Sequence, residues 1–326
     1  MKKTMTWMCL AALLTAAGCT NQFGSIVPPA VPKSATAHPL APQALKILKA
    51  GLENDNSYIR TPAIEITAET GQKQFLPSVV QSTDHRAVTA RFAAAVALGD
   101  MQCKSCRPVL QKKLDDENPN VRIAAAYSLV KIGDKKYQEM IRRALNSTDP
   151  TVKANAILLL GKLGDQEDLN RIRSIMHNND EVEKVRFQAL ESLSRLGDPK
   201  VYREKIWPLL ISKYHDDRVW GIRCMGALAT PEAKTAVQTM LQDDILEVRL
   251  TAAEQLGQLG DRSGKDRVRE YLEQTPNLDE TSMANQMAVS AIGTIGDQAL
   301  NAYLPKALAS KSPIIQLIAA KAVLMQ

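Results

Sequence analysis

Most of the chain follows a helical pattern of apolar and polar positions. In the stretch 121–132 apolar residues recur every three or four positions, which predicts an amphipathic helix. The stretch ends in Gly133-Asp134: a glycine suits the left-handed C-terminal cap of a helix, and an aspartate can cap the helix that follows. A second helical segment follows over 137–145, and no stretch sustains strand alternation. The apolar stripe of the first segment comprises Val121, Ala124, Ala125, Leu129 and Ile132.

This pair of helices recurs along the chain. Val121-Arg122 and its counterparts open the second helix of each pair, and Gly-Asp closes it. The copies begin at positions 59, 88, 121, 152, 185, 219, 248, 284 and 315, a mean interval of 32 residues. A fixed period of this length is typical of a solenoid. We therefore expect an all-α solenoid of about nine helix pairs over residues 42–326.

The repeat unit resembles HEAT repeats of the short bacterial type first noted in phycobilisome lyases. The resemblance rests on an Asp, then Val-Arg, Ala-Ala and Leu-Gly-Asp, and on prolines within first helices such as Pro77 and Pro305, which bend a helix. It implies that the basic residue opening each second helix bonds carbonyls or Asp in nearby loops. Such repeated groups serve the unit rather than catalysis: Arg60, Arg122, Lys153, Arg186 and Arg249, with Asp100, Asp134, Asp165, Asp198, Asp261 and Asp297.

The N-terminus reads as an export signal over residues 1–18. Lys2 and Lys3 precede an uncharged, mostly apolar stretch over 6–17, too short to span a bilayer. The sequence Thr15-Ala-Ala-Gly-Cys19 resembles the lipobox of bacterial lipoproteins, although Ala16 stands where Leu is usual. The resemblance implies cleavage after Gly18 and attachment of palmitate-type acyl chains to Cys19. An ordinary signal peptide, or a cytoplasmic chain with an apolar first helix, is the alternative.

Thr20 after the cysteine implies sorting to the outer membrane, facing the periplasm. Five prolines between residues 28 and 42 then predict an extended tether over residues 19–41, with a loop packed on the first repeat as the alternative. The protein is thus expected in the bacterial cell envelope, anchored by lipid.

Composition narrows the function. The chain has 41 Lys and Arg against 35 Asp and Glu, and Lys2 and Lys3 leave with the signal, so the remaining charge is only +4. Nucleic acid is therefore not an expected partner. The four histidines form no ligand spacing, and no phosphate loop or nucleophile motif occurs. We expect no catalytic residue, no metal and no cofactor.

Cys103 and Cys106 are the one feature outside the repeat that invites chemistry. A local disulfide in an oxidising compartment, a redox-active dithiol and part of a metal site are the three interpretations. Cys224 lies within a second helix and is expected in the core.

The function that this pattern favours is a scaffold that binds a protein partner on the face of the second helices. The alternatives are an enzyme accessory or thiol–disulfide factor using Cys103 and Cys106, and a structural spacer of the envelope. By helix phase, the candidate binding face comprises Arg91, Tyr127, Lys131, Asn155, Lys162, Gln188, Arg195, Arg223, Glu254 and Gln258.

The C-terminus lacks the polar capping repeat that usually ends a solenoid. Ile315, Ile318, Ala322 and Val323 can pack inward, whereas Leu317, Ala320 and Leu324 lie elsewhere on the last helix. Either small apolar faces tolerate water, or this edge docks a partner or a second copy of the chain.

Overall fold

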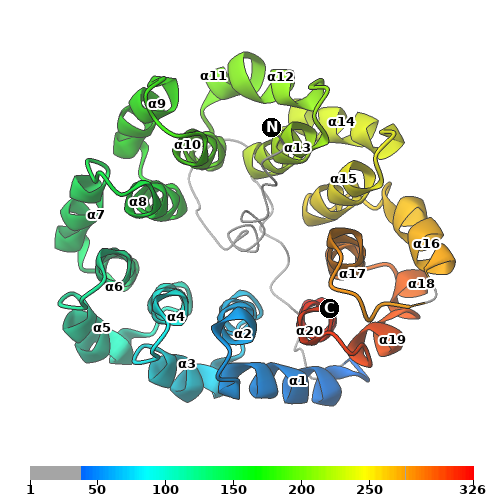
Figure 1. Cartoon of the computed structure of the whole chain (residues 1–326), viewed down its shortest axis with the longest axis horizontal. Helices are drawn as coiled ribbons and strands as arrows, with labels where there is room; N and C mark the ends of the chain where they lie inside the picture. The colour runs from blue at the N-terminus through cyan, green and yellow to red at the C-terminus, as the bar shows by residue number, and fades with distance from the viewer. Residues whose placement is uncertain (1–37, 276) are drawn as a thin grey trace, which may run out of the picture.

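The computed structural model describes residues 38–275 and 277–326, and that part consists of helices joined by turns. The helices form two concentric layers (Figure 1). The inner layer contains α2 (Ser57–Glu69), α4 (Val88–Asp100), α6 (Pro119–Lys131), α8 (Pro150–Leu163), α10 (Glu183–Arg195), α13 (His215–Leu228), α15 (Leu246–Gln258), α17 (Met283–Ile295) and α20 (Pro313–Leu324).

The outer layer is made of shorter helices, one or two to each inner helix. It contains α1 (Ala41–Glu53), α3 (Leu76–Ser82), α5 (Arg107–Lys113), α7 (Gln138–Ala144), α9 (Leu169–His177), α11 (Pro199–Val201), α12 (Trp207–Leu210), α14 (Pro231–Thr239), α16 (Lys265–Gln274), α18 (Gln298–Asn301) and α19 (Leu304–Leu308). Short 3₁₀ turns adjoin several of them: η1 (Lys73–Phe75), η2 (Lys104–Cys106), η3 (Lys135–Tyr137), η4 (Gln166–Asp168) and η6 (Met240–Gln242). A π-helical segment, η5 (Tyr202–Ile206), joins α11 to α12.

The repeats close into a ring instead of ending as an open arc. The last inner helix, α20, packs against α1 and α2, so the first and last helix pairs are neighbours (Figure 1). Each helix pair buries an apolar face against the pairs on both sides, and one continuous core therefore runs round the ring.

Closure corrects the expectation of an exposed C-terminal edge. Leu317, Ala320 and Leu324 are all buried, because α1 and α2 cover this side of α20. The fit is close at Gly51, where an added Cβ would lie 2.9 Å from Leu317 Cδ2. The apolar C-terminus is thus the partner of the first repeat, and these side chains are not available for self-association.

The turn chemistry expected from Gly-Asp is confirmed at several repeats, although Asp134 makes no side-chain capping bond and pairs with Arg107 instead. The glycine adopts a left-handed conformation, as at Gly164 with φ of 75°. The aspartate that follows caps the next segment, and Asp165 accepts from the Glu167 N–H at 3.0 Å. Gly133, Gly197, Gly260 and Gly296 share the positive φ, and Asp198 and Asp297 share the capping bond.

The arginines that open three inner helices, Arg60, Arg122 and Arg249, have the structural role that the family resemblance implied. Lys153 pairs instead with Glu181, and the buried Nε of Arg186 has no hydrogen-bond partner among the described residues. Arg122 donates to the carbonyls of Asp116 and Glu117, at 2.9 and 3.1 Å. Arg249 repeats this with Asp243 and Asp244. These bonds satisfy the turn between the outer and inner helix of one pair.

The repeated aspartates join neighbouring pairs through ion bridges on the outer side. Arg142 of α7 contacts Asp165 at 3.2 Å and the fully buried carboxylate of Asp168 at 2.7 Å. Further bridges of this kind are Arg107–Asp134, Arg173–Asp198 and Lys234–Asp261.

The register of the second repeat differs from the one expected. Arg91 donates to the carbonyls of His85 and Arg86, as Arg122 does to its own turn, so the two arginines are equivalent. A 31-residue step also separates Arg60, Arg91, Arg122 and Lys153. The unit therefore begins at position 90, not 88, and Gln102, with φ of 54°, takes the place of Gly133.

The misleading signal was Gly99-Asp100, which forms the last two residues of α4 and precedes the left-handed turn residue Gln102 instead of supplying it. Gly99 serves close packing of helices, since an added Cβ would stand 2.4 Å from Ser128 Oγ on α6. Asp100 is consequently not one of the aspartates that bridge neighbouring helix pairs on the outer side. A similar shift affects the sixth repeat, where Arg218 donates to the carbonyl of Ser212 and so replaces the expected start at 219.

Candidate binding site on the inner face of the ring

Every inner helix except α20 ends at a turn with a residue of positive φ, and the side chains two and six positions before that residue carry most of the inner charge. Counting back from Gly71, Gln102, Gly133, Gly164 and Gly197, the first set comprises Glu69, Asp100, Lys131, Lys162 and Arg195. The second set includes Glu65, Tyr127, Glu191, Arg223, Glu254 and Ser290, with Lys321 of α20 at the matching phase. We call these side chains the inner face.

One network crosses three consecutive inner helices. The Tyr127 hydroxyl of α6 donates to Asp100 Oδ1 of α4 at 2.5 Å, and Lys162 Nζ of α8 lies 2.6 Å from Asp100 Oδ2. The Lys162 ammonium also stands 5.6 Å from the centroid of the Tyr127 ring. A lysine that reaches past one repeat to the next but one is possible only on the inside of the ring, where the radius is smallest.

A second network closes the ring. Lys321 Nζ of α20 lies 2.6 Å from Glu69 Oε2 of α2, and both side chains are largely buried. On the adjoining helices, Ser290 of α17 donates to Glu254 of α15 at 2.6 Å. The contact between the last repeat and the first, which we call the seam, is therefore stabilised by the Lys321–Glu69 ion pair on the inner face and by the packing of Leu317 against α1.

Burial and crowding perturb the acids of α2. Burial, reinforced by the neighbouring Glu69 charge, raises the pKa of Glu65 to about 8 even though Lys162 and Lys321 oppose the shift. Burial also raises the pKa of Glu69. For Lys321 burial works against the charge, but the carboxylates of Glu69, Glu254 and Glu65 prevail and raise its pKa.

A pH-dependent stability follows for Glu65. A carboxyl whose pKa is raised by folding binds its proton more tightly in the folded state, so the folded protein loses stability as the pH rises from about 4.5 to about 8. We expect Glu65→Gln to remove this loss and to stabilise the protein by about 1–2 kcal/mol at pH 9, with little difference at pH 4.5. Denaturant unfolding at both pH values measures it. The matched control is Glu53→Gln on α1, whose side chain is 60% exposed; equal pH profiles for the two variants would contradict the assignment.

The structure brings most of the predicted binding residues together. Tyr127, Lys131, Lys162, Arg195, Arg223, Glu254 and Gln258 hold the phases defined above, and Asn155 and Gln188 lie nine residues before their turns, on the same side. Arg91 does not belong to this face. The residue is 7% exposed and is held by Asp116 at 3.0 Å. The prediction was wrong because it counted helix phase from position 88 and not from position 90.

Sequence reasoning missed Glu65, Glu69, Ser290 and Lys321. They occupy the same helical phase as the residues that were selected, in the first and the last two repeats. Counting from the turn in every copy, including the degenerate ones, would have found them.

The charges on the inner face are segregated around the ring. Acids dominate on α2 and α4, whereas the consecutive helices α6, α8, α10 and α13 contribute Lys131, Lys162, Arg195 and Arg223 together with Glu191 of α10. We call the four basic side chains the basic arc. Lys162 and Arg195 are paired, with Asp100 and Glu191 respectively, while Lys131 and Arg223 form no ion pair with residues in 38–275 or 277–326.

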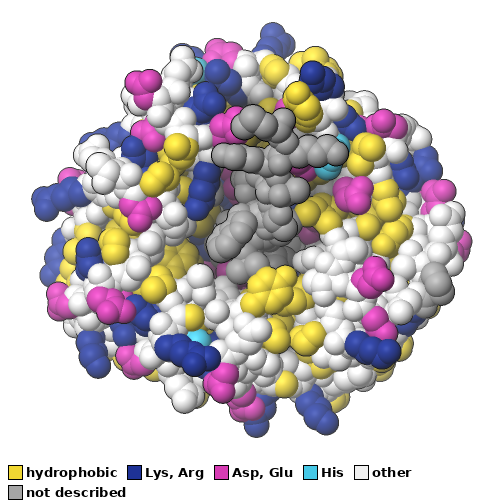
Figure 2. Space-filling view, viewed as in Figure 1, with side chains coloured by type: hydrophobic (Ala, Val, Ile, Leu, Met, Phe, Trp, Pro, Cys, Tyr) yellow, Lys and Arg dark blue, Asp and Glu magenta, His cyan; other side chains and the backbone are white. Residues whose placement is uncertain are grey.

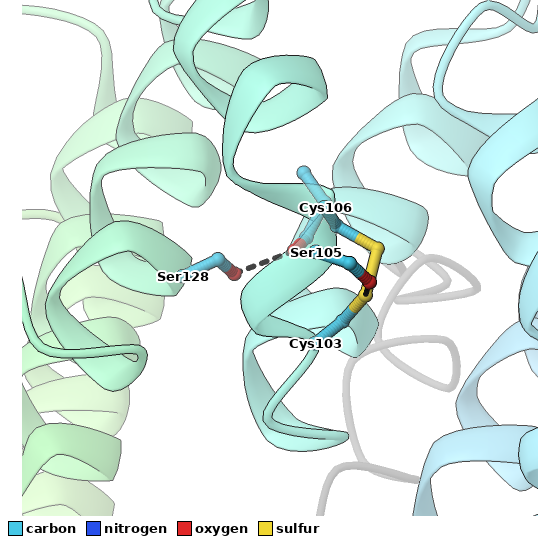
Figure 3. Close-up of a disulfide and its surroundings, with 5 residues drawn as sticks. Cys103, Ser105, Cys106 and Ser128 are labelled. Atoms are coloured by element: carbon cyan, nitrogen blue, oxygen red, sulfur yellow. Dashed lines mark hydrogen bonds between the residues drawn. A yellow bond between two sulfur atoms is a disulfide. The ribbon is translucent and has the colours of Figure 1, made fainter.

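Cys103 and Cys106 form a disulfide in η2, on the approach to α5 (Figure 3). Cys103 stands where other repeats place the capping aspartate, and its sulfur lies 3.4 Å from Ser105 Oγ. Beside it, the hydroxyl of Ser128 donates to the carbonyl of Ala95 at 2.5 Å and ties α6 to α4. The two cysteines are only 6% and 5% exposed, which disfavours attack by an external thiolate.

Other reactive groups are similarly enclosed. Cys224 lies fully buried in α13, and burial raises the pKa of its thiol. Within the described ranges, no three His, Cys, Asp or Glu side chains are grouped so that they could hold a metal ion. Nor does that part contain a helix long and apolar enough to cross a membrane.

A two-layered ring of helix pairs with these turns and ladders defines a helical-repeat protein. HEAT repeats match the chain over residues 76–146, 137–204 and 209–287, which is more than half of it. The chain therefore belongs to the HEAT-repeat family. No curated protein matches it in sequence.

Solved structures with a similar course of the chain are only distantly related. Human deoxyhypusine hydroxylase is 19% identical over 79% of this chain and 96% of its own, with a TM-score of 0.39. The complex of CpcE and CpcF of phycocyanin lyase from Nostoc sp. PCC7120 is 16% identical over 78% of this chain and 93% of its own, with a TM-score of 0.43. Kap121p is 14% identical over 85% of this chain and 40% of its own, with a TM-score of 0.32.

Proposed function

We propose that the protein is a lipid-anchored scaffold of the bacterial cell envelope whose HEAT-repeat ring binds a protein partner on its inner face, without catalysis of its own. The anchor rests on the lipobox-like sequence ending at Cys19, which lies outside the described residues. Intact mass of the protein from its membrane fraction tests it. The mass of two or three acyl chains should be present, and Cys19→Ser should abolish it; an unprocessed Met1 without lipid would contradict the anchor.

The observation that carries the binding proposal is the basic arc. Contact with water alone does not require side chains of one charge. Four consecutive inner helices nevertheless each place a lysine or an arginine on the inner face. Complementary charge guides and orients protein association. A partner segment that carries carboxylates would pair with Lys131 and Arg223, the two members of the arc without a carboxylate among the described residues.

Closure of the ring restricts the form of the partner. The inner helices encircle the centre of the ring (Figure 1), so a partner would have to approach their inner face along the ring axis. An extended segment or a loop fits this access better than the flat surface of a globular domain. The acids and bases of the inner face mostly bind one another, which suits recognition more than proton transfer.

Site-specific cross-linking tests this function. A photo-reactive residue at Lys131 is expected to capture a defined partner in the intact envelope, whereas the same residue at Arg143, whose side chain is 80% exposed on the outer helix α7, is not. Lys131→Glu with Arg223→Glu should reduce recovery of that partner about tenfold or more, since like charges replace complementary ones. Equal labelling from both positions, or recovery unchanged by charge reversal, would contradict the inner face as the binding surface.

A further inference from the structure

The sixth repeat carries an apolar patch on the outside of the ring. Among the described residues, the two most exposed large apolar side chains are Ile211, at 70%, and Tyr214, at 60%, and Trp207 is 43% exposed. All three lie within eight consecutive residues, and Tyr202 packs against Trp207 with ring centroids 6.3 Å apart. We call Tyr202, Trp207, Ile211 and Tyr214 the outer patch.

Local structure explains why these side chains face outward. The outer layer is broken here into α11, the π-helical η5 and α12, whereas α7 and α16 are uninterrupted. Ile206 and Leu210 still enter the core, whereas Trp207 and Ile211, one position further along and so about 100° round the helix, are exposed to solvent. π-helical turns are rare and are frequently found at functional sites.

The surroundings of the outer patch are basic. Lys200, Arg203, Lys205 and Lys213 are exposed around it, against Glu204 within residues 199–214 and Asp216 and Asp217 at the start of α13. The Lys213 ammonium lies 4.9 Å from the centre of the Tyr214 ring. In Figure 2, apolar and basic side chains occur together at the top of the ring, where Figure 1 places α11 and α12. By comparison, α7 exposes the charged Arg143 at 80% and the apolar Met140 at only 37%.

We infer that the outer patch is a membrane-contacting surface that rests on a bilayer containing anionic phospholipid. Trp and Tyr favour the boundary between acyl chains and headgroups, Ile can enter the acyl layer, and the surrounding lysines and arginine match anionic headgroups. The inference rests on the proposed lipid anchor for its location. The 18 residues between Cys19 and His38 can span about 60 Å when extended, enough to let the ring turn this sector to the bilayer.

Fluorescence of Trp207 tests the inference directly. The chain from residue 19 onward contains two tryptophans, and Trp220 stacks on Phe187 at 5.4 Å, so Trp220→Phe leaves Trp207 as the sole reporter. We would use this chain with Cys19→Ser, without acyl groups, and vesicles of phosphatidylethanolamine and phosphatidylglycerol. Trp207 emission should shift to shorter wavelength and be quenched by brominated lipid.

Matched variants distinguish insertion of the outer patch from nonspecific binding to vesicles. Ile211→Ser should weaken partition to these vesicles about tenfold, because the burial of one aliphatic side chain is lost. Tyr58→Ser, at an aromatic residue 47% exposed on α2, should leave partition unchanged. If Trp207 inserts into vesicles but the native protein carries no lipid on Cys19, the proposed anchor is wrong and the membrane assignment of the outer patch stands. No shift with vesicles, or a shift caused only by added envelope proteins, would overturn the membrane assignment.

Discussion

Leu317→Glu is expected to open the ring and to lower the free energy of unfolding by about 4 kcal/mol. Leu317 is 1% exposed and fits against Gly51 of α1, so the new carboxylate would be buried without a partner. The damage should concentrate at the seam, because every other repeat keeps both neighbours. Hydrogen exchange should therefore lose protection in α1, α2 and α20 first, while α6, α8 and α10 remain protected.

The same substitution on the outer surface provides the control. Ile211→Glu places a carboxylate at a side chain that is 70% exposed and should leave unfolding in solution nearly unchanged. Uniform loss of protection in all inner helices of the Leu317→Glu protein would indicate general unfolding, and full protection in α1 and α20 would show that they do not depend on each other.

Lys321→Met is the second substitution with a large expected effect. It leaves the largely buried carboxylate of Glu69 without its partner at 2.6 Å, next to Glu65. Removing one member of a buried pair typically costs about 3–5 kcal/mol. The loss should be largest at alkaline pH and should shrink as the pH falls, because Glu69, whose pKa burial already raises, then binds a proton and no longer needs the ammonium group.

The double variant distinguishes a pair interaction from lost packing. Glu69→Gln combined with Lys321→Met should recover most of the stability, since no buried charge then remains. Lys311→Met, at a side chain 86% exposed and 3.5 Å from Asp279, is the matched control and should change stability little. A loss that is independent of pH and is not recovered in the double variant would show that Lys321 acts through packing alone.

The repeat architecture could be predicted from sequence because it is local and repeated. A helix face, a glycine in the left-handed conformation and an aspartate cap recur at nearly constant spacing, and each copy supports the others. The exception at Gly99 is instructive. Glycine serves both to end a helix and to let two helices approach, and only the position of Ser128 on the next inner helix shows which role applies.

Ring closure could not be read from the period. Whether a solenoid closes depends on small rotations accumulated over all repeats, which no single motif specifies. The sequence did contain a consequence of closure, the apolar C-terminus with Leu317, Ala320 and Leu324, but an edge buried by α1 has the same composition as an edge awaiting a partner. Glu65 and Glu69 of α2 could not be recognised as part of the charged network from sequence, because Lys321 and Lys162 come near them only in the closed ring.

Ring closure, on which the enclosed binding face depends, is tested most directly by the distance between spin labels on the first and last repeats. Lys49→Cys on α1 and Lys311→Cys before α20 provide exposed sites, with Cys19→Ser in the same protein and Cys224 fully buried. Neighbouring helix pairs have axes about 10 Å apart. The ring predicts one narrow distance distribution below about 35 Å, the reach of adjacent pairs with helices of this length. A broad distribution at longer distances would show an open arc and would contradict the account.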